Sequence, residues 1–267
     1  MRRLVTAAIP WLLPLVVLVT WQLAGSAEWL SGKVLPTPVD VGKAGISLLR
    51  SGELGRHMFA SCCRAAMGFV IGGVIGLSLG LLTGTSNSAE RLLDTSVQML
   101  RTIPHLALIP LVILWFGVGE IGKIFLVSLG VTFPIYLNTH HGFRTVDRGL
   151  IEMGRVYGLG RWKLFTQVLL PGALPAILVG VRYALGVMWL TLIVAETISA
   201  TVGIGYLAMN AREFLRSDIV LLCVLLYAVL GKLADVIARQ LERSLLPWHP
   251  AFVSDDSRST SRRKELQ

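Results

Sequence analysis

Apolar runs separated by polar segments make up most of the chain. Six of them approach the roughly 20 residues with which a helix crosses the hydrocarbon core of a bilayer. The third run is short and contains Pro104 and Pro110, so the alternative is five spans with a re-entrant third segment. The pattern predicts an all-α polytopic membrane protein with one transmembrane domain over residues 7–252. The runs lie at about 7–24, 65–84, 103–118, 121–138, 174–195 and 219–237.

Composition supports this class. The chain has 267 residues, of which 54% are hydrophobic and 15% are charged, whereas soluble domains carry about 25% charged residues. These values exclude a soluble domain, a disordered chain and a disulfide scaffold. A formal net charge of +9 would suggest nucleic acid for a soluble protein, but in a membrane protein basic loops set the orientation. We therefore expect a lipid bilayer, and no nucleic acid, as the surroundings of this chain.

Basic loops predict the orientation. Residues 140–172 and the segment after 237 are rich in Lys and Arg, and with six spans they share one side with residues 1–6. The positive-inside rule makes that side the cytoplasm, although the basic segment 25–64 on the other side weighs against it. We expect the first span to be retained rather than cleaved as a signal peptide. Residues 253–267, rich in Ser, Arg and Asp, are predicted to form a disordered cytoplasmic tail.

The segment Gly117–Lys123 matches two nucleotide-binding motifs. It has the G-x-G-x-x-G spacing of dinucleotide sites and the G-x-x-x-x-G-K start of a P-loop. Both motifs need a strand before the glycines and a helix after them, and a P-loop needs Ser or Thr after the lysine. Here apolar runs flank the segment and Ile124 follows the lysine. We expect a tight turn on the outer face and no ATP site.

Other candidate chemistry is sparse. Three histidines lack partner ligands at metal-binding spacing, and three cysteines are interpreted as small apolar filler. No nucleophile–base pair is identifiable, so we expect neither an enzyme nor a metal or cofactor bound by this chain. The histidines and cysteines are His105, His140, His141, Cys62, Cys63 and Cys223.

Glycines recur every four residues through the second span, at Gly68, Gly72, Gly76, Gly80 and Gly84. On a helix this spacing forms one smooth stripe, and small residues let membrane helices approach closely. We interpret the stripe as a helix-packing face. The alternative is a sliding surface in a moving transporter.

Charged residues within the spans are few, and such residues are costly and usually functional. Arg182 and Glu196 flank the fifth span and are candidates for the substrate pathway or its gate. Their separation along one helix is about 21 Å, so they cannot pair directly. Lys232 and Asp235 have the i,i+3 spacing of an ion pair.

The segment 140–172 predicts a helix–turn–helix between two spans. Its helical stretches cover about 147–157 and 161–169, with Gly158–Gly160 between them, and Leu170–Pro171 should end the second. The element is either a protein-docking surface or an ordinary structured loop, and the residue pattern leaves both open. One apolar face of the second stretch comprises Trp162, Phe165 and Leu169.

These residues resemble the EAA loop of ABC importer permeases, whose pattern is E-A-A, three residues, G, nine residues and I-x-L-P. The spacing fits throughout, although Met153, Gly154 and Val168 depart from the consensus. From about Trp11 to Pro250 the chain is similar to the nitrate, taurine and aliphatic-sulfonate branch, with aliphatic sulfonate permeases nearest; the segments IPHLALIPLVILWFG and GIGYLAMNAREFL carry this likeness. The matched loop positions are Glu152, Met153, Gly154, Gly158, Val168, Leu169, Leu170 and Pro171.

The resemblance implies a type I ABC importer transmembrane domain in the bacterial inner membrane, paired with a second copy around one pathway. Two separate ATPase subunits, which carry ATP and Mg, would dock on the loop at 140–172, and a periplasmic binding protein would deliver the substrate. ATP binding would turn the pathway from inward- to outward-facing. The implied docking element comprises Arg148, Glu152, Met153, Gly154, Arg155, Gly158, Leu170 and Pro171.

Two other classes of membrane protein fit this sequence less well than a permease. A secondary transporter would carry ion-coupling carboxylates or broken helices in mid-membrane, yet the acids here lie at span ends. A membrane-embedded enzyme would need His, Asp or Glu converging within the membrane, and none is visible in the sequence. The leading expectation is an aliphatic sulfonate importer, with taurine, nitrate or another small anion as alternative substrates.

Overall fold

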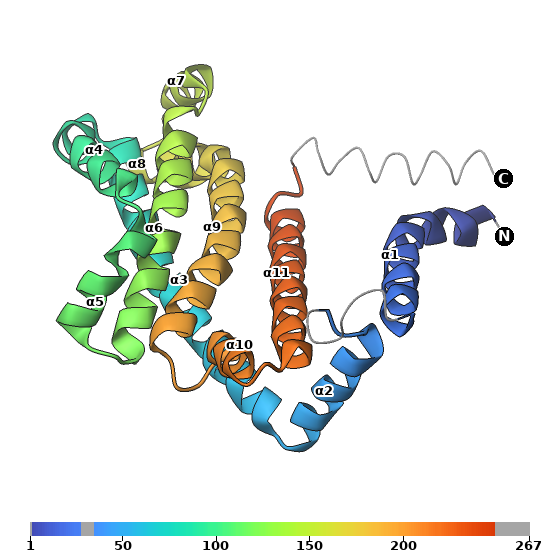
Figure 1. Cartoon of the computed structure of the whole chain (residues 1–267). Coiled ribbons are helices and arrows are strands. Elements are labelled where there is room, and N and C mark those ends of the chain that lie inside the picture. Colours follow the sequence, from blue (N-terminus) through green and yellow to red (C-terminus); the bar gives the residue numbers. More distant parts are fainter. Residues whose placement is uncertain (1, 28–34, 249–267) are drawn as a thin grey trace. The chain divides into compact units, whose positions relative to one another are not determined.

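The structure is a computed structural model that describes residues 2–27 and 35–248. Every regular element within these residues is a helix, so the predicted all-α class is confirmed (Figure 1). The chain divides into two compact units. Of the described residues, 2–27, 35–63 and 193–229 form the first unit, and 64–192 and 230–248 form the second.

Long and short helices alternate along the chain. A 3-10 turn, His105–Leu108, precedes α5, and a π-helical turn, Phe165–Leu169, joins α8 to α9. The α-helices are α1 (Arg2–Ser26), α2 (Pro38–Arg50), α3 (Glu53–Thr85), α4 (Asn87–Thr102), α5 (Ile109–Phe116), α6 (Glu120–Arg144), α7 (Arg148–Val156), α8 (Arg161–Leu164), α9 (Leu170–Ser199), α10 (Ile204–Glu213) and α11 (Ser217–Leu245).

Four described stretches are long and apolar enough to cross a membrane, namely α3, α6, Arg161–Ile198 and α11. A fifth candidate is α4 together with His105–Phe116, a pair bent by 78° that forms either a broken span or a re-entrant loop. The third predicted span is therefore the second half of this bent pair. The described apolar part of α1, Leu12–Ser26, is shorter, so the total of six spans stays a prediction.

Two prolines explain the bend. Proline disfavours the helical region for the residue before it, and Ile103, which precedes Pro104, is extended with ψ 121°. Pro110 lies in the first turn of α5, where its missing N–H costs no hydrogen bond. Helix α4 therefore ends at this point, and α5 begins in a new direction.

The glycine stripe of α3 packs against α6 in the second unit. At every position of the stripe, an added Cβ would approach an α6 atom more closely than real side chains do, so only hydrogen fits. Thr132 Oγ1 of α6 also donates to the Gly72 carbonyl oxygen across this contact, at 3.2 Å. The stripe therefore lies in close contact with α6. The closest α6 atoms lie 2.5, 2.3, 2.6, 2.6 and 2.8 Å from the Cβ positions built at Gly68, Gly72, Gly76, Gly80 and Gly84.

In the first unit, α2 is an amphipathic helix that packs by one face. The side chain of its N-cap residue, Thr37, accepts the Asp40 N–H. Pro36, the residue before the cap, contacts α1, since Trp21 Nε1 donates to its carbonyl oxygen at 3.1 Å. Its apolar face is buried, and Gly45 on that face lets Leu222 of α11 approach to 3.3 Å from the Cβ position. The buried positions of α2 are Val41, Ala44, Gly45 and Leu48.

Candidate functional site

Residues 140–172, which we name the coupling loop after the role that the resemblance implies, belong to the second unit and contain the two predicted helices. Asp147 caps the start of α7 through its carboxylate. At the other end Gly158 has φ +74°, a left-handed conformation that suits glycine. The Leu159 N–H then donates to the Gly154 carbonyl oxygen at 3.0 Å and closes the end of the helix. The predicted turn at Gly158 is confirmed.

The second helical stretch departs from the prediction. Helix α8 passes into the π-helical turn, and α9 begins at Leu170, so Pro171 does not end the helix. A proline inside an α-helix removes one hydrogen bond and its ring clashes with the carbonyl four residues earlier. Here the register is shifted, because the Leu170 N–H donates to the Phe165 carbonyl oxygen five residues earlier. The π-helical turn therefore lets the chain run through Pro171 into α9.

Small and apolar side chains anchor the coupling loop. Gly154 is buried, and a Cβ there would lie 2.7 Å from Leu164 Cδ1, so the third position of the E-A-A pattern requires a small residue. The ring of Phe165 stacks on Phe143 of α6, with centroids 6.0 Å apart. Both rings belong to an apolar cluster that extends to α9. The cluster comprises Phe143, Val146, Ala173 and Ile177, with Ile151, Phe165, Val168, Leu169 and Val181 packed on it.

The outer side of the coupling loop carries charged and aromatic side chains. Trp162, part of the predicted apolar face, is 73% exposed, and its ring stacks on Phe165. Tyr157 is 79% exposed. Arg148, Glu152 and Arg155 are exposed as well. We name the five residues Arg148, Glu152, Arg155, Tyr157 and Trp162 the docking face.

A cavity of about 370 Å³ lies behind α7. Met153 and Gly154 line it from α7, and Val168 and Pro171 line it from the π-helical turn and α9. Trp248 from the segment after α11 contributes as well. The bulk that Met153 adds at the middle E-A-A position is therefore accommodated at the rim of this cavity.

Arg182, a candidate for the pathway or gate, belongs to an ion-pair network between α9 and α11. It lies 2.8 Å from Asp235 and 3.9 Å from Glu242. Asp235 also binds Arg239 at 2.6 Å and Lys232 at 3.5 Å, so the predicted i,i+3 pair is confirmed. A gating role for Arg182 stays a prediction.

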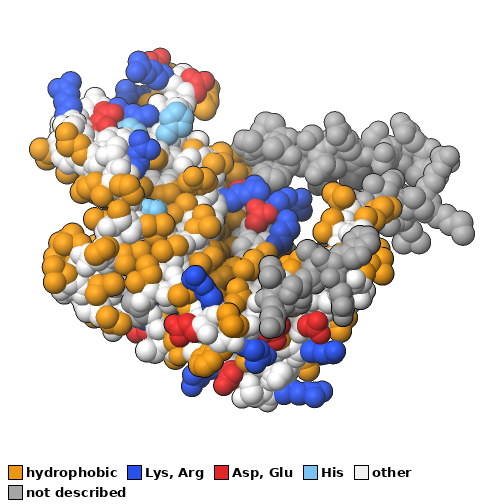
Figure 2. All heavy atoms as spheres, viewed as in Figure 1, with side chains coloured by type: hydrophobic (Ala, Val, Ile, Leu, Met, Phe, Trp, Pro, Cys, Tyr) orange, Lys and Arg blue, Asp and Glu red, His pale blue; other side chains and the backbone are white. Residues whose placement is uncertain are grey.

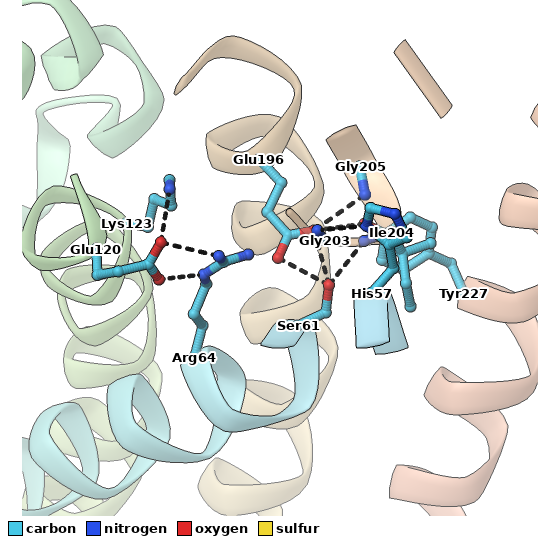
Figure 3. A network of polar contacts seen from close by, with 10 residues as sticks. All are labelled: His57, Ser61, Arg64, Glu120, Lys123, Glu196, Gly203, Ile204, Gly205 and Tyr227. Atoms are coloured by element: carbon cyan, nitrogen blue, oxygen red, sulfur yellow. Dashed lines mark hydrogen bonds and ion pairs between the residues drawn. The ribbon is translucent and has the colours of Figure 1, made fainter. Parts of the chain in front are cut away.

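Glu196, the other gate candidate, is buried in the first unit and holds the start of α10 (Figure 3). Its carboxylate accepts the Ser61 hydroxyl at 2.7 Å and the Gly205 N–H at 2.9 Å. Three successive N–H groups at this helix start, which an α-helix leaves without internal partners, are thus bound by side chains. The donors and acceptors are Gly203 N–H to His57 Nδ1, Ile204 N–H to Ser61 Oγ and Gly205 N–H to Glu196 Oε2, each at 2.9 Å.

Gly203 lets the carboxylate approach. Its φ is +139°, and a Cβ there would lie 2.5 Å from Glu196 Cδ. The Glu196 side chain is 1% exposed and accepts hydrogen bonds from the Ser61 hydroxyl and the Gly205 N–H. Burial of an ionised carboxylate requires such hydrogen bonds.

A second polar cluster lies in the second unit, between α3 and α6 (Figure 3). Arg64 binds Glu120 through two nitrogens, with Nη2 2.8 Å from Oε1. Lys123 Nζ reaches the same Oε1 at 3.0 Å. The side chains of Arg64 and Lys123 are 5% and 3% exposed, whereas that of Glu120 is 55% exposed. This cluster joins the two helices that the glycine stripe also joins.

The segment Gly117–Lys123 forms the predicted tight turn. Gly117 has φ +72° and ends α5, and Gly119 precedes α6. Lys123, which would be the phosphate-binding lysine of a P-loop, is instead buried and forms an ion pair with Glu120. The side of the membrane on which the turn lies stays a prediction.

Two of the three candidate histidines hydrogen-bond to neighbouring helices. His105 Nε2 lies 3.0 Å from Thr191 Oγ1, and His140 Nδ1 lies 3.0 Å from Thr83 Oγ1. In the described part of the chain, no group of three His, Cys, Asp or Glu side chains is placed to hold a metal ion. The three cysteines are free thiols.

Sequence reasoning missed four residues of the two polar clusters, namely His57, Ser61, Arg64 and Glu120. One signal was available for the ion pair, because Arg64 and Glu120 stand at the start of the second and fourth apolar runs. Opposite charges at the ends of packed spans form ion pairs readily. No local signal existed for the contacts of Ser61 and His57, which join residues more than a hundred positions apart.

The fold and the coupling loop together define a multi-pass permease subunit of an ABC importer. The pattern of the binding-protein-dependent transport system inner membrane component matches residues 72–247, and this chain belongs to that family. Two solved structures share the fold. An amino acid ABC transporter with histidines has a TM-score of 0.61 at 15% identity, over 75% of this chain and 97% of the other. The inward-facing MetNI methionine ABC transporter has a TM-score of 0.57 at 21% identity, over 72% and 97%.

Sequence relatives place the chain within the family. It is 61% identical, over 91% of this chain and 92% of the relative, to a protein of Escherichia coli (strain K12) named as an aliphatic sulfonates transport permease, SsuC. It is 34% identical to the taurine transport system permease TauC of the same organism, over 88% and 87%. It is 32% identical to the nitrate import permease NrtB of Synechocystis, over 87% and 86%.

Proposed function

We propose that two copies of this chain form a pathway through the bacterial inner membrane for aliphatic sulfonates, with both termini in the cytoplasm. Two partner ATPase subunits hydrolyse ATP with Mg, and a periplasmic binding protein delivers the sulfonate. ATP binding alternates the pathway between inward- and outward-facing states. The chain itself contributes no catalytic group.

The docking face is the single observation that carries the coupling role. It presents two arginines, one glutamate and two exposed aromatic rings on helices that are fixed to α6 and α9 by an apolar cluster. Exposed aromatic and arginine side chains are typical of protein interfaces. Since the π-helical turn makes α8 continuous with α9, a displacement of the loop is transmitted directly to a membrane-spanning helix.

Charge reversal at Arg155 tests the docking role. We expect Arg155→Glu to reduce recovery of the ATPase subunits in a detergent pull-down, because acids on the ATPase would lose their partner. Arg212→Glu, which reverses the charge of an exposed arginine of α10 outside the coupling loop, is the matched control. Equal recovery and transport for both variants would contradict the proposal.

Growth tests the substrate. A strain that lacks this gene and any redundant sulfonate uptake system should fail to use alkanesulfonates as sole sulfur source and should recover when the gene is returned. Normal growth of the deletion strain would remove the sulfonate assignment. Taurine and nitrate, the substrates in the names of two relatives, are then the next compounds to supply.

A further inference from the structure

Arg64 and Lys123 present an ordered set of hydrogen-bond donors to one carboxylate. Arg64 Nε and Nη2 bind the two oxygens of Glu120, and Lys123 Nζ lies 3.0 Å from one of them (Figure 3). This forked arrangement is the one in which arginine binds planar or tetrahedral oxyanions. The donors come from α3 and α6, which are fixed against each other by the glycine stripe.

Burial is distributed unevenly within the cluster. Both cations are almost fully buried, but more than half of the Glu120 side-chain surface is exposed. The donors are therefore held in place, while the carboxylate has room to swing aside. The cluster is also not needed to join α3 to α6, because close backbone contacts at Gly68, Gly72 and Gly76 already do so.

The start of α6 strengthens the attraction for an anion. Glu120 lies in the first turn of α6, and Gly119 at the N-cap provides no side-chain hydrogen bond. The free N–H groups and the dipole of a helix N-terminus favour negative charge. A sulfonate has three oxygens where a carboxylate has two, so it can accept from the arginine and the lysine and keep one oxygen for a further donor.

We propose that Arg64 and Lys123 form an oxyanion site for the sulfonate head group of the transported substrate, and that Glu120 is a built-in competitor which occupies the site when no substrate is present. The proposal rests on the proposed function, because it assumes an anionic sulfonate in the pathway. Charge is conserved in the exchange, since one anion leaves the two cations as another arrives. When the Glu120 carboxylate binds Arg64 and Lys123 again, it displaces the sulfonate and so assists its release.

The test measures sulfonate binding by the permease–ATPase complex in nonionic detergent, without the binding protein. Ethanesulfonate is titrated by calorimetry, with the neutral ethyl methyl sulfone as the comparison ligand. Removing the competitor by Glu120→Gln should tighten ethanesulfonate binding by about tenfold, and Lys123→Met should weaken it by about tenfold, since hydrogen bonds to charged groups are at stake. Glu90→Gln, which removes the acid of the separate Arg144–Glu90 pair, should leave binding unchanged.

Opposite signs for the two variants distinguish a binding site from an ion pair that only stabilises the fold. If Glu120→Gln and Lys123→Met both weaken binding, or neither changes it, the proposal is wrong. Where Glu120→Gln is too unstable to purify, Lys123→Met is compared with wild type, because that variant leaves Arg64 and Glu120 paired. Weaker ethanesulfonate binding at an unchanged free energy of unfolding supports the site, and any other result overturns it. Equal competition by added phosphatidylglycerol would assign the site to a lipid head group and would also overturn the proposal.

The substrate assignment is tested apart from the site. If a deletion strain grows normally on alkanesulfonates, the proposed substrate is wrong, yet tighter binding of sulfate or nitrate by Glu120→Gln than by wild type would still support an oxyanion site. If the deletion strain fails to grow but Glu120→Gln shows no gain for any of these anions, the transport function stands and the site does not.

Discussion

Replacing Gly72 by alanine should separate α3 from α6. The added Cβ would lie 2.3 Å from the Ser128 carbonyl oxygen and 3.0 Å from its carbonyl carbon. These are backbone atoms of a helix, so no side-chain rotation relieves the clash. Carbon atoms pack at about 3.5 Å, and α6 would therefore have to retreat by about 1 Å.

Gly73 provides a matched control on the same helix. A Cβ there would meet only Ile135 Cδ1, at 3.7 Å, which is ordinary contact. Gly73→Ala should therefore stabilise the protein by about 0.5–1 kcal/mol, the usual gain in helix propensity. Gly72→Ala should destabilise it by about 1–3 kcal/mol through overpacking, and it also disturbs the hydrogen bond from Thr132 to the Gly72 carbonyl.

The free energy of unfolding of both variants is to be measured in the same detergent, by denaturant titration followed by tryptophan fluorescence. The two identical substitutions at adjacent positions should therefore differ in the free energy of unfolding by about 1.5–4 kcal/mol. Equal stabilities, or a less stable Gly73→Ala, would refute the close approach of α3 and α6 as the structure describes it.

Three further changes test the coupling loop and the buried polar groups. Gly158→Ala, at φ +74°, should cost about 1 kcal/mol and lower ATPase recovery in a pull-down, whereas Gly160→Ala, at φ −64° with open space around it, should change neither. Ser61→Ala removes one hydrogen bond each from two buried groups and should lower the free energy of unfolding by about 1–3 kcal/mol; an unchanged value would contradict the buried network. Tyr136→Phe, which loses a 2.6 Å bond to Asp94, should cost about 1 kcal/mol in the same assay, and no loss would show that the bond is not formed.

Local sequence patterns predict one part of the coupling loop correctly and another part wrongly. The turn at Gly158 and the small residue at Gly154 follow from the sequence, because a left-handed turn and a close contact both restrict side-chain size. The helix through Pro171 does not follow. A proline ends most helices, whereas here a π-helical turn, whose Phe165 and Leu169 pack on an apolar cluster with residues of α6 and α9, leads the chain through Pro171.

The sequence by itself determined the helical membrane class, the packing stripe on α3 and the position of the coupling loop. Each of these depends on local spacing, either the length of an apolar run or a four-residue repeat on one helix. The tertiary structure alone decided the partners of the charged residues. Arg64 with Glu120 and Ser61 with Glu196 are 56 and 135 residues apart, and pairing over such distances is set by which helices pack together, which the spacing along any one helix does not encode.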